Sequence, residues 1–178
     1  MVRKRTSIMT TIVVLLLCFF GAIFLLRMNN TEQYVPEIEK QARISLEIPD
    51  SWEAVSETTN NIAAVLLYDN ASNQHIFATY SNSHFVNAKE KFSLIAGGVL
   101  PTNQASIAKV SISGSNEVIF ASMNPYRACI LQITDEDKFS TIHIDPEKPF
   151  VIILSTIEGD VTFYDENDDV IAYDGFVV

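Results

Sequence analysis

Cysteine is scarce in this chain, which has only Cys18 and Cys129 among its 178 residues. Cys18 lies within a long apolar run, so residues 28–178 hold a single thiol and cannot form an internal disulfide. Their stability must come from buried apolar area, for which a segment of this length is sufficient, or from pairing with another chain. Cys129 stands between apolar residues, a setting typical of an inert thiol inside a strand.

Catalytic and cofactor signatures are absent as well. The three histidines, His75, His84 and His143, lack the spacing of metal ligands, and the chain has no GxSxG elbow, glycine-rich phosphate loop or CxxC pair. We therefore predict no catalytic, cofactor-binding or metal-binding residues, no cofactor and no enzymatic activity. A hydrolase that uses dispersed carboxylates stays open as an alternative, because the chain carries 22 acidic residues.

Basic residues are few beyond residue 27. Eight of them stand against 22 acidic residues in the segment 28–178, which gives this part of the chain a formal charge of −14. A surface of this sign repels nucleic-acid phosphates and anionic lipid headgroups, so nucleic acid is excluded as a partner. A basic protein, a basic peptide or a divalent cation is electrostatically compatible with it.

What the chain does contain is an uncharged run from Ile8 to Leu26, preceded by Arg3, Lys4 and Arg5 and closed by Arg27. A helix of this length spans roughly 28 Å, about the thickness of a bilayer core. No small residues suited to signal cleavage follow the run. The pattern predicts an uncleaved transmembrane signal-anchor over residues 8–27, in contact with the lipid bilayer.

The distribution of charge predicts the orientation of this segment. Basic residues mark the cytoplasmic side, which places the basic head, residues 1–7, in the cytoplasm. We predict a stalk over residues 28–43 and one extracytoplasmic domain over residues 44–178, in a protein that crosses the cell membrane once. Within the stalk, Pro36 followed by acidic residues is typical of the first turn of a brief helix.

Apolar runs separated by turn residues predict a succession of strands in the domain. The strands are expected at Ile44–Ile48, Ile62–Tyr68, His75–Tyr80, Ala108–Ile112, Val118–Met123, Arg127–Thr134, Phe139–Ile144, Phe150–Thr156, Val161–Tyr164 and Val170–Tyr173. One main helix is expected where Phe85, Ala88, Phe92 and Ile95 recur on one face, with Gly97 and Gly98 at its end. The predicted fold class is α+β: an N-terminal transmembrane helix, then one domain with an antiparallel β-sheet and one main helix.

The run Phe150–Leu154 is apolar without alternation. A strand with this composition is typically covered on both faces, which predicts a central position. Periodicity alone leaves a short buried helix open for the same residues.

Two local segments resemble known families. Ile44–Trp52, with the sequence ISLEIPDSW, resembles the opening of PsbP/Mog1-like domains, and the predicted order of strands and helix beyond it is similar. Asp145–Phe150 is similar to a strand-to-helix segment of bacterial pleckstrin-homology-like membrane proteins. Both resemblances imply a binding or assembly module, and neither implies a catalytic residue.

The acidic segment Asp165–Asp169 is the best candidate for cation binding. Asp165, Asn167 and Asp169 have the spacing of the first three ligands of a calcium loop. Position six of that loop is Val170 instead of glycine, and position twelve is Phe176 instead of glutamate. The segment is therefore interpreted as a hydrated hairpin tip between two strands.

These observations favour a membrane-anchored extracytoplasmic interaction or assembly module with a protein partner at the membrane. Two alternatives stay open: an extracytoplasmic ligand-binding or sensing domain, and the carboxylate-based hydrolase. A deep pocket lined by aromatic residues would favour the ligand-binding domain, whereas a flat surface or an edge strand would favour the interaction module.

Overall fold

Twelve β-strands and one short helix make up the residues that the computed structural model describes, namely 37–82, 92–100, 106–135, 138–155 and 159–178. The helix covers residues 37–46. The strands are β1 Glu53–Thr58, β2 Ile62–Asp69, β3 Gln74–Asn82, β4 Phe92–Gly98, β5 Ile107–Ser111, β6 Glu117–Ser122, β7 Ile130–Asp135, β8 Lys138–His143, β9 Phe150–Ser155, β10 Asp160–Tyr164, β11 Val170–Ile171 and β12 Tyr173–Val177.

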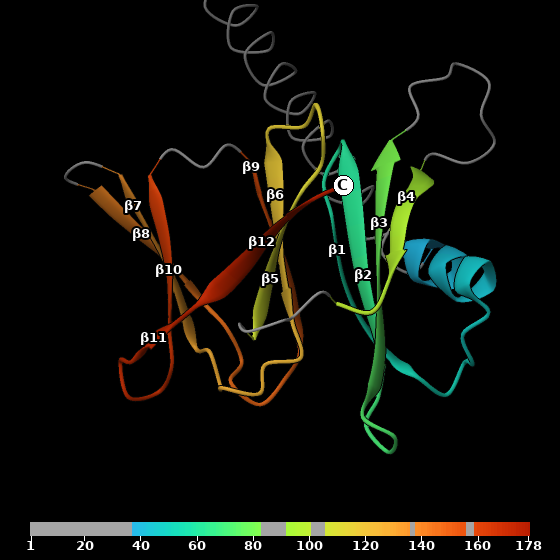
Figure 1. Cartoon of the computed structure of the whole chain (residues 1–178), viewed down its shortest axis with the longest axis horizontal. Helices are drawn as coiled ribbons and strands as arrows, with labels where there is room; N and C mark the ends of the chain where they lie inside the picture. Colours follow the sequence, from blue (N-terminus) through green and yellow to red (C-terminus); the bar gives the residue numbers. More distant parts are fainter. Residues whose placement is uncertain (1–36, 83–91, 101–105, 136–137, 156–158) are drawn as a thin grey trace, which may run out of the picture. The chain divides into compact units, whose positions relative to one another are not determined.

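The strands form three four-stranded sheets (Figure 1). Sheet A has the order β1-β2-β3-β4, sheet B the order β12-β5-β6-β9, and sheet C the order β11-β10-β7-β8. All neighbouring strands are antiparallel except β12, which runs parallel to β5. Because β12 follows β11 in the chain, the C-terminal segment passes from sheet C to sheet B and connects the two.

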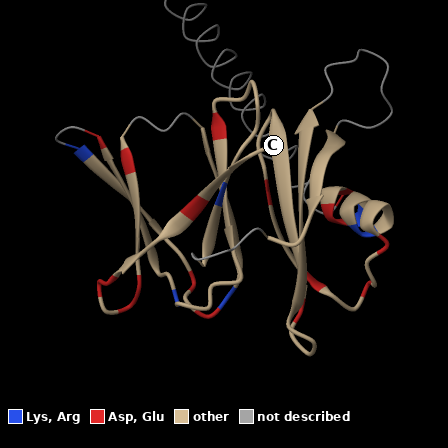
Figure 2. Ribbon diagram, in the orientation of Figure 1, with Lys and Arg blue, Asp and Glu red and all other residues tan. Residues whose placement is uncertain are grey.

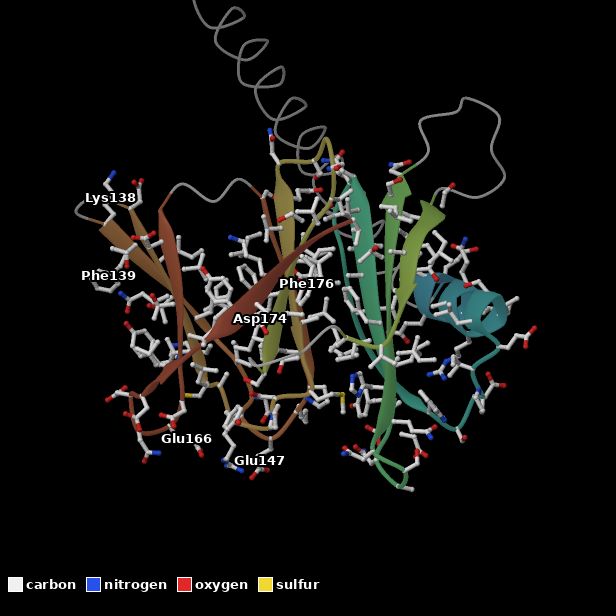
Figure 3. All side chains as sticks on the ribbon, viewed as in Figure 1. Lys138, Phe139, Glu147, Glu166, Asp174 and Phe176 are labelled. Atoms are coloured by element: carbon white, nitrogen blue, oxygen red, sulfur yellow. The ribbon has the colours of Figure 1, made fainter. Side chains whose placement is uncertain are left out.

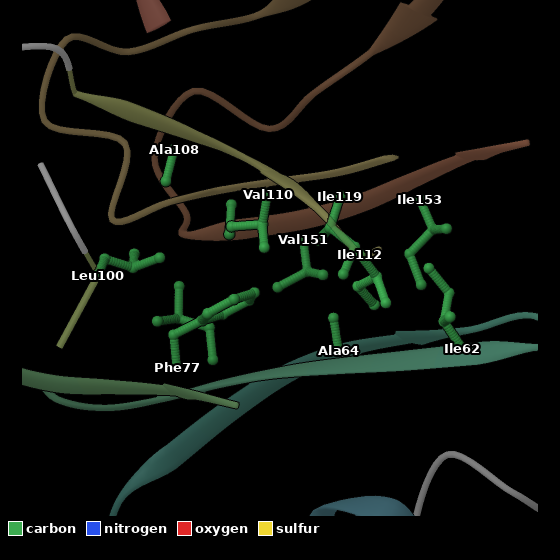
Figure 4. Packing of buried hydrophobic residues seen from close by; sticks show 12 residues of the cluster. Ile62, Ala64, Phe77, Leu100, Ala108, Val110, Ile112, Ile119, Val151 and Ile153 are labelled. Atoms are coloured by element: carbon green, nitrogen blue, oxygen red, sulfur yellow. The ribbon is translucent and has the colours of Figure 1, made fainter. Parts of the chain in front are cut away.

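Three apolar clusters hold the layers together. The first joins sheets A and B through side chains such as Leu66, Phe77 and Ile119 (Figure 4). The second joins sheets B and C around Phe120 and Phe163, whose rings meet edge to face with centroids 5.2 Å apart. The third lies between sheet A and the helix. Sheet B is thus the middle layer of the sheets, and all three clusters lie within residues 37–178.

The helix begins where the sequence predicts a brief helix after Pro36, and it packs on sheet A. Ile38 and Ala42, one turn apart, are buried against Val65 and Tyr80. Gln41 donates a hydrogen bond from Nε2 to the Phe92 carbonyl at 3.1 Å. Residues 37–43, expected in a stalk, therefore belong to the folded unit.

The predicted fold class is wrong in its helices and in its sheet number. None of the helical residues that the structure describes forms a segment of the length and apolar character that a membrane crossing needs. The predicted transmembrane segment 8–27 itself lies outside the described residues. The fold is mainly β, with three sheets instead of one.

The predicted main helix is contradicted from Phe92 onward, because these residues form β4; residues 83–91 lie outside the described part of the chain. Phe92 pairs with Asn82 of β3, and Ile95 remains 37% exposed instead of facing a core. Helical spacing of apolar residues was outweighed by pairing with β3, which is a tertiary effect. Gly97 lies inside β4 and does not end a helix. It packs closely on the side chain of Leu46, because a Cβ atom at this position would lie only 3.2 Å from Leu46.

The predicted strand Ile44–Ile48 is also wrong. The helix continues to residue 46, and Ile44 is 70% exposed. The first strand is instead β1, which was not predicted from the sequence. Alternation of three apolar residues suits a strand, yet the i, i+4 pair of Ile38 and Ala42 anchors the helix that contains Ile44.

The other predicted strands are confirmed with boundary shifts of a few residues, except Val170–Tyr173, which is divided between the two-residue β11 of sheet C and the start of β12 in sheet B. The Gly114 turn joins β5 to β6, and Ser115 donates its backbone N–H to the Ile112 carbonyl at 3.0 Å. The continuous run Phe150–Leu154 is covered on both faces, by sheets A and C, as predicted. It is nevertheless the terminal strand of sheet B, so the prediction of a central position is wrong.

Candidate interaction surface

One face of sheet C packs on sheet B, and the other face, which we call the outer face, carries polar and aromatic side chains. Leu131, Val161 and Phe163 lie in the core. Because side chains alternate along a strand, their neighbours in β7 and β10 point the other way, and the registers extend this pattern to β8. The outer face consists of Ile130, Gln132, Thr134, Phe139, Thr141, His143, Asp160, Thr162, Tyr164 and Val170.

The outer face carries little charge in a strongly acidic chain. Asp160 is its only carboxylate, and it includes no lysine or arginine. Figure 2 shows that many of the charged residues of this part of the fold lie in loops and at strand ends. Depletion of charge together with exposed aromatic residues distinguishes the centre of protein interfaces from the rest of a surface.

Phe139 is the most prominent side chain of this face. It is 73% exposed, next to Lys138 at the start of β8 (Figure 3). Only Ile142 of β8 is partly buried against the core, and the other five residues are exposed. Strand β8 thus contributes little to the core and presents most of its side chains to solvent.

The main chain of β8 presents a free edge. Ile144 donates its N–H to the Cys129 carbonyl at 2.9 Å, which shows that its main chain points toward β7. Main-chain groups alternate in direction along a strand. Phe139, Thr141 and His143 therefore direct their N–H and C=O groups away from β7, and no described strand pairs with them.

The terminal strand β9 of sheet B is covered in a different way. Ile153 donates its N–H to the Glu57 carboxylate of β1 at 2.8 Å, so a side chain of sheet A occupies the edge of sheet B. Burial raises the pKa of Glu57, and the hydrogen bond from Ile153 opposes this increase. The carboxylate is thus held in a partly desolvated position to satisfy a main-chain donor.

Of the remaining terminal strands, β1 lies against β9, to which its Glu57 is hydrogen-bonded, and the others are short or irregular. Strand β4 pairs with β3 through a register shift between Thr79 and Tyr80. Strand β11 has two residues, and the five residues of β12 include Asp174 and Gly175, which are residue types that strands disfavour. Bulges, shortness and charge are the usual protections of sheet edges. Strand β8 has six residues in unbroken register and none of these protections within the strand except Lys138 at its end.

The loops beyond the His143 end of β8 are braced by charged side chains. Arg127 forms a two-pronged pair with Glu166 and lies 3.6 Å from Glu147. The hydrogen bond and charge of Arg127 lower the pKa of Glu166. Beneath them, buried Asn124 accepts the Ala128 N–H at 2.7 Å and donates to the Ala128 carbonyl at 3.1 Å. These contacts hold the β6–β7, β8–β9 and β10–β11 loops together, and their role is structural.

The acidic hairpin Asp165–Asp169 lies in the same region, and the Asp165 carboxylate forms hydrogen bonds within the hairpin. The Asp165 Oδ1 atom accepts backbone N–H groups from Asn167 at 2.8 Å and from Asp169 at 2.9 Å. These bonds lower the pKa of Asp165. Among the residues that the structure describes, no group of three or more histidine, cysteine, aspartate or glutamate side chains is arranged to hold a metal ion.

A second cluster of titratable side chains lies in sheet A. Glu53, Tyr68 and His75 are directly opposite one another on β1, β2 and β3. Tyr68 donates its hydroxyl to Glu53 at 3.0 Å, and burial followed by this interaction raises the pKa of Tyr68 to about 12. Burial lowers the pKa of His75. Glu53 also accepts from Asn70 at 2.7 Å, so the row stabilises the β2–β3 turn.

The strand that contains Phe139 was predicted from the sequence, but the exposure of Phe139 was not. The available signal was the composition of β8, in which polar residues occupy positions on both faces of the strand. Cys129 was expected inside a strand, and it lies just before β7, where burial raises the pKa of its thiol. His84 lies outside the described residues, whereas His75 and His143 lie in different sheets.

No protein-family model matches this chain, and comparison with curated proteins and with solved structures finds no match either. The resemblances to PsbP/Mog1-like domains and to pleckstrin-homology-like proteins therefore stay predictions.

Proposed function

We propose that residues 37–178 form an interaction module that binds a protein partner through β8 and the outer face of sheet C. The observation that carries this proposal is the free edge of β8, where three consecutive outer-face residues leave six main-chain groups unpaired within the described fold. Strand addition to such an edge is an established mode of protein recognition. The charge-poor outer face lies directly beside it and can bury the partner's side chains.

Photo-crosslinking in living cells tests the proposal. A photoreactive phenylalanine analogue at position 139 is expected to form a discrete adduct with a protein. The matched control places the same analogue at Asn70, which is exposed on the β2–β3 turn. The proposal is contradicted if position 139 gives no adduct, or if both positions give the same ones.

An enzymatic role receives no comparable support from the described residues. The hydrolase hypothesis requires a pair of carboxylates that face a shared substrate position. Partly buried Glu57 accepts the N–H of Ile153 in β9, and buried Glu117 lies on β6 with its Oε2 atom lacking a partner among the described residues. A single such group supplies no acid–base pair.

The extracytoplasmic location of the domain stays a prediction. External protease added to intact cells is expected to digest residues 44–178. Full protection of this segment, under conditions in which a known external marker is cut, would contradict the location.

A further inference from the structure

We propose that the partner at β8 is a second copy of the same chain, paired antiparallel through β8 to give one continuous sheet across two copies. This inference rests on the proposed function and names its partner. Two features of β8 carry it: the direction of its main-chain groups and its side-chain pattern.

The main-chain groups select one register. In a two-fold antiparallel pair, residues with main-chain groups on the free edge can face each other as hydrogen-bonded pairs. Centring the pair on Thr141 places Phe139 opposite His143 of the second copy. All three edge residues then bond in each copy, which satisfies the six main-chain groups of each edge. Shifting the centre to Ser140 leaves His143 beyond the pairing, so that register forms fewer bonds.

The side chains agree with the register centred on Thr141. On the outer face, each Phe139 ring lies opposite an imidazole, and Thr141 lies opposite itself. Aromatic pairs and threonine pairs are both favourable across neighbouring strands. On the inner face, Ser140 lies opposite Ile142, so the pairing brings no two charged side chains directly opposite each other.

The charged side chains beyond the His143 end of β8 are engaged within each copy. Asp145 pairs with Lys148 at 2.9 Å, and Glu147 lies 3.6 Å from Arg127. Attraction between copies therefore comes from the edge of β8 and not from the charges beyond its ends. The outer face, with Asp160 as its only charge, then continues across the junction without a like-charge contact at its centre.

Cysteine cross-linking in the full-length chain tests this register. In a background with Cys18 and Cys129 replaced by alanine, Thr141→Cys is expected to give a cross-linked dimer with a short bis-maleimide, because the two Cα atoms of a hydrogen-bonded pair lie about 5.5 Å apart. Thr162→Cys is the matched control, since it lies on the same face but in β10. It is expected to give at least about tenfold less dimer.

The other outcomes contradict the inference in separate ways. Stronger cross-linking of Ser140→Cys than of Thr141→Cys would contradict the register. Equal, low yields for Thr141→Cys and Thr162→Cys would contradict self-pairing. If the photo-adduct at position 139 contains a different protein and no second copy, self-pairing is wrong although the proposed function holds. Absence of any adduct would contradict both.

A solution measurement separates pairing from folding. Residues 37–178 contain all three apolar clusters and form one unit, so they can be studied alone. Thr141→Pro removes an N–H that faces the free edge, and it is expected to weaken dimerisation at least about tenfold in sedimentation velocity without changing the circular dichroism spectrum. Unchanged dimerisation of this variant would overturn the proposal.

Discussion

Strands β9 and β8 are both terminal strands of four-stranded sheets, but a side chain covers the edge of β9, whereas the edge of β8 is uncovered in the described part of the chain. At β9 the Glu57 carboxylate, contributed by sheet A, accepts the N–H of Ile153 at 2.8 Å. At β8 the main-chain groups of Phe139, Thr141 and His143 have no described strand beside them. A side chain that covers an edge must be partly desolvated, and the raised pKa of Glu57 reflects this cost. The same protein thus protects one edge at a cost in electrostatics and leaves another available.

The largest effect that distinguishes the two sides of β8 is expected from proline. The main chain of Ile142 points toward β7, so Ile142→Pro removes a ladder hydrogen bond, which costs about 1–3 kcal/mol for the unpaired acceptor alone, and the proline ring adds a steric conflict with the strand. Thr141→Pro, one residue away, removes only an N–H on the free side and should cost far less. Urea denaturation of residues 37–178 measures both. Equal destabilisation would show that β8 has no free side.

A smaller loss is expected where the edge of β9 is uncovered. Glu57→Ala leaves the N–H of Ile153 without its acceptor, and an unsatisfied buried donor costs about 1–3 kcal/mol. Chemical denaturation gives the change in free energy of unfolding. The control is Glu39→Ala. Glu39 lies in the helix, and its carboxylate accepts a hydrogen bond from the hydroxyl of Ser56, the neighbour of Glu57 in β1. A Glu57→Ala variant as stable as the wild type would indicate that water satisfies this N–H.

The pH dependence of stability should isolate the electrostatic cost at the same edge. Because burial raises the folded pKa of Glu57 above its ordinary value, its contribution to stability is present below the unfolded pKa and is lost as pH rises through the folded pKa. Glu57→Gln keeps an oxygen acceptor and does not ionise. Relative to the wild type, it should therefore gain stability as pH rises from about 4 toward 7. A parallel pH profile for the two proteins would contradict this assignment.

The smallest effect on stability is expected from Phe139→Ser. The ring is 73% exposed, so its loss should change the free energy of unfolding by no more than about 0.5 kcal/mol. Dimerisation of residues 37–178 should nevertheless weaken measurably, because the ring faces an imidazole in the proposed pairing. Thermal denaturation and sedimentation provide the two measurements. A large loss of stability would place Phe139 in the core and remove the contrast with β9.

Much of the strand pattern could be predicted from the sequence, because it depends on neighbours in the chain. The hairpin of β5 and β6 is specified by alternating apolar residues on either side of Gly114, whose φ of +80° suits glycine. The acidic hairpin tip was also predicted as a turn, and Asp165 supports it through local backbone hydrogen bonds. These features need no information from distant residues.

The candidate surface could not be predicted in the same way. Whether a strand is terminal depends on which strands lie beside it, and the composition of β8 specifies only that most of its side chains are exposed. The strand β4 illustrates the same difficulty. Phe92 and Ile95 have helical spacing, but the available partner was β3, and pairing with it decided the conformation.

The turns, the continuous apolar runs and the acidic character of residues 28–178 follow from the amino-acid sequence alone, because each of them depends on local composition. The distribution of strands among three sheets, the parallel pairing of β12 with β5 and the position of Glu57 at the edge of β9 depend on the packing of the whole domain. Main-chain hydrogen bonds between strands are nearly the same for every residue pair and therefore do not select partners. Burial of side chains between layers selects which strands meet and which edge remains free.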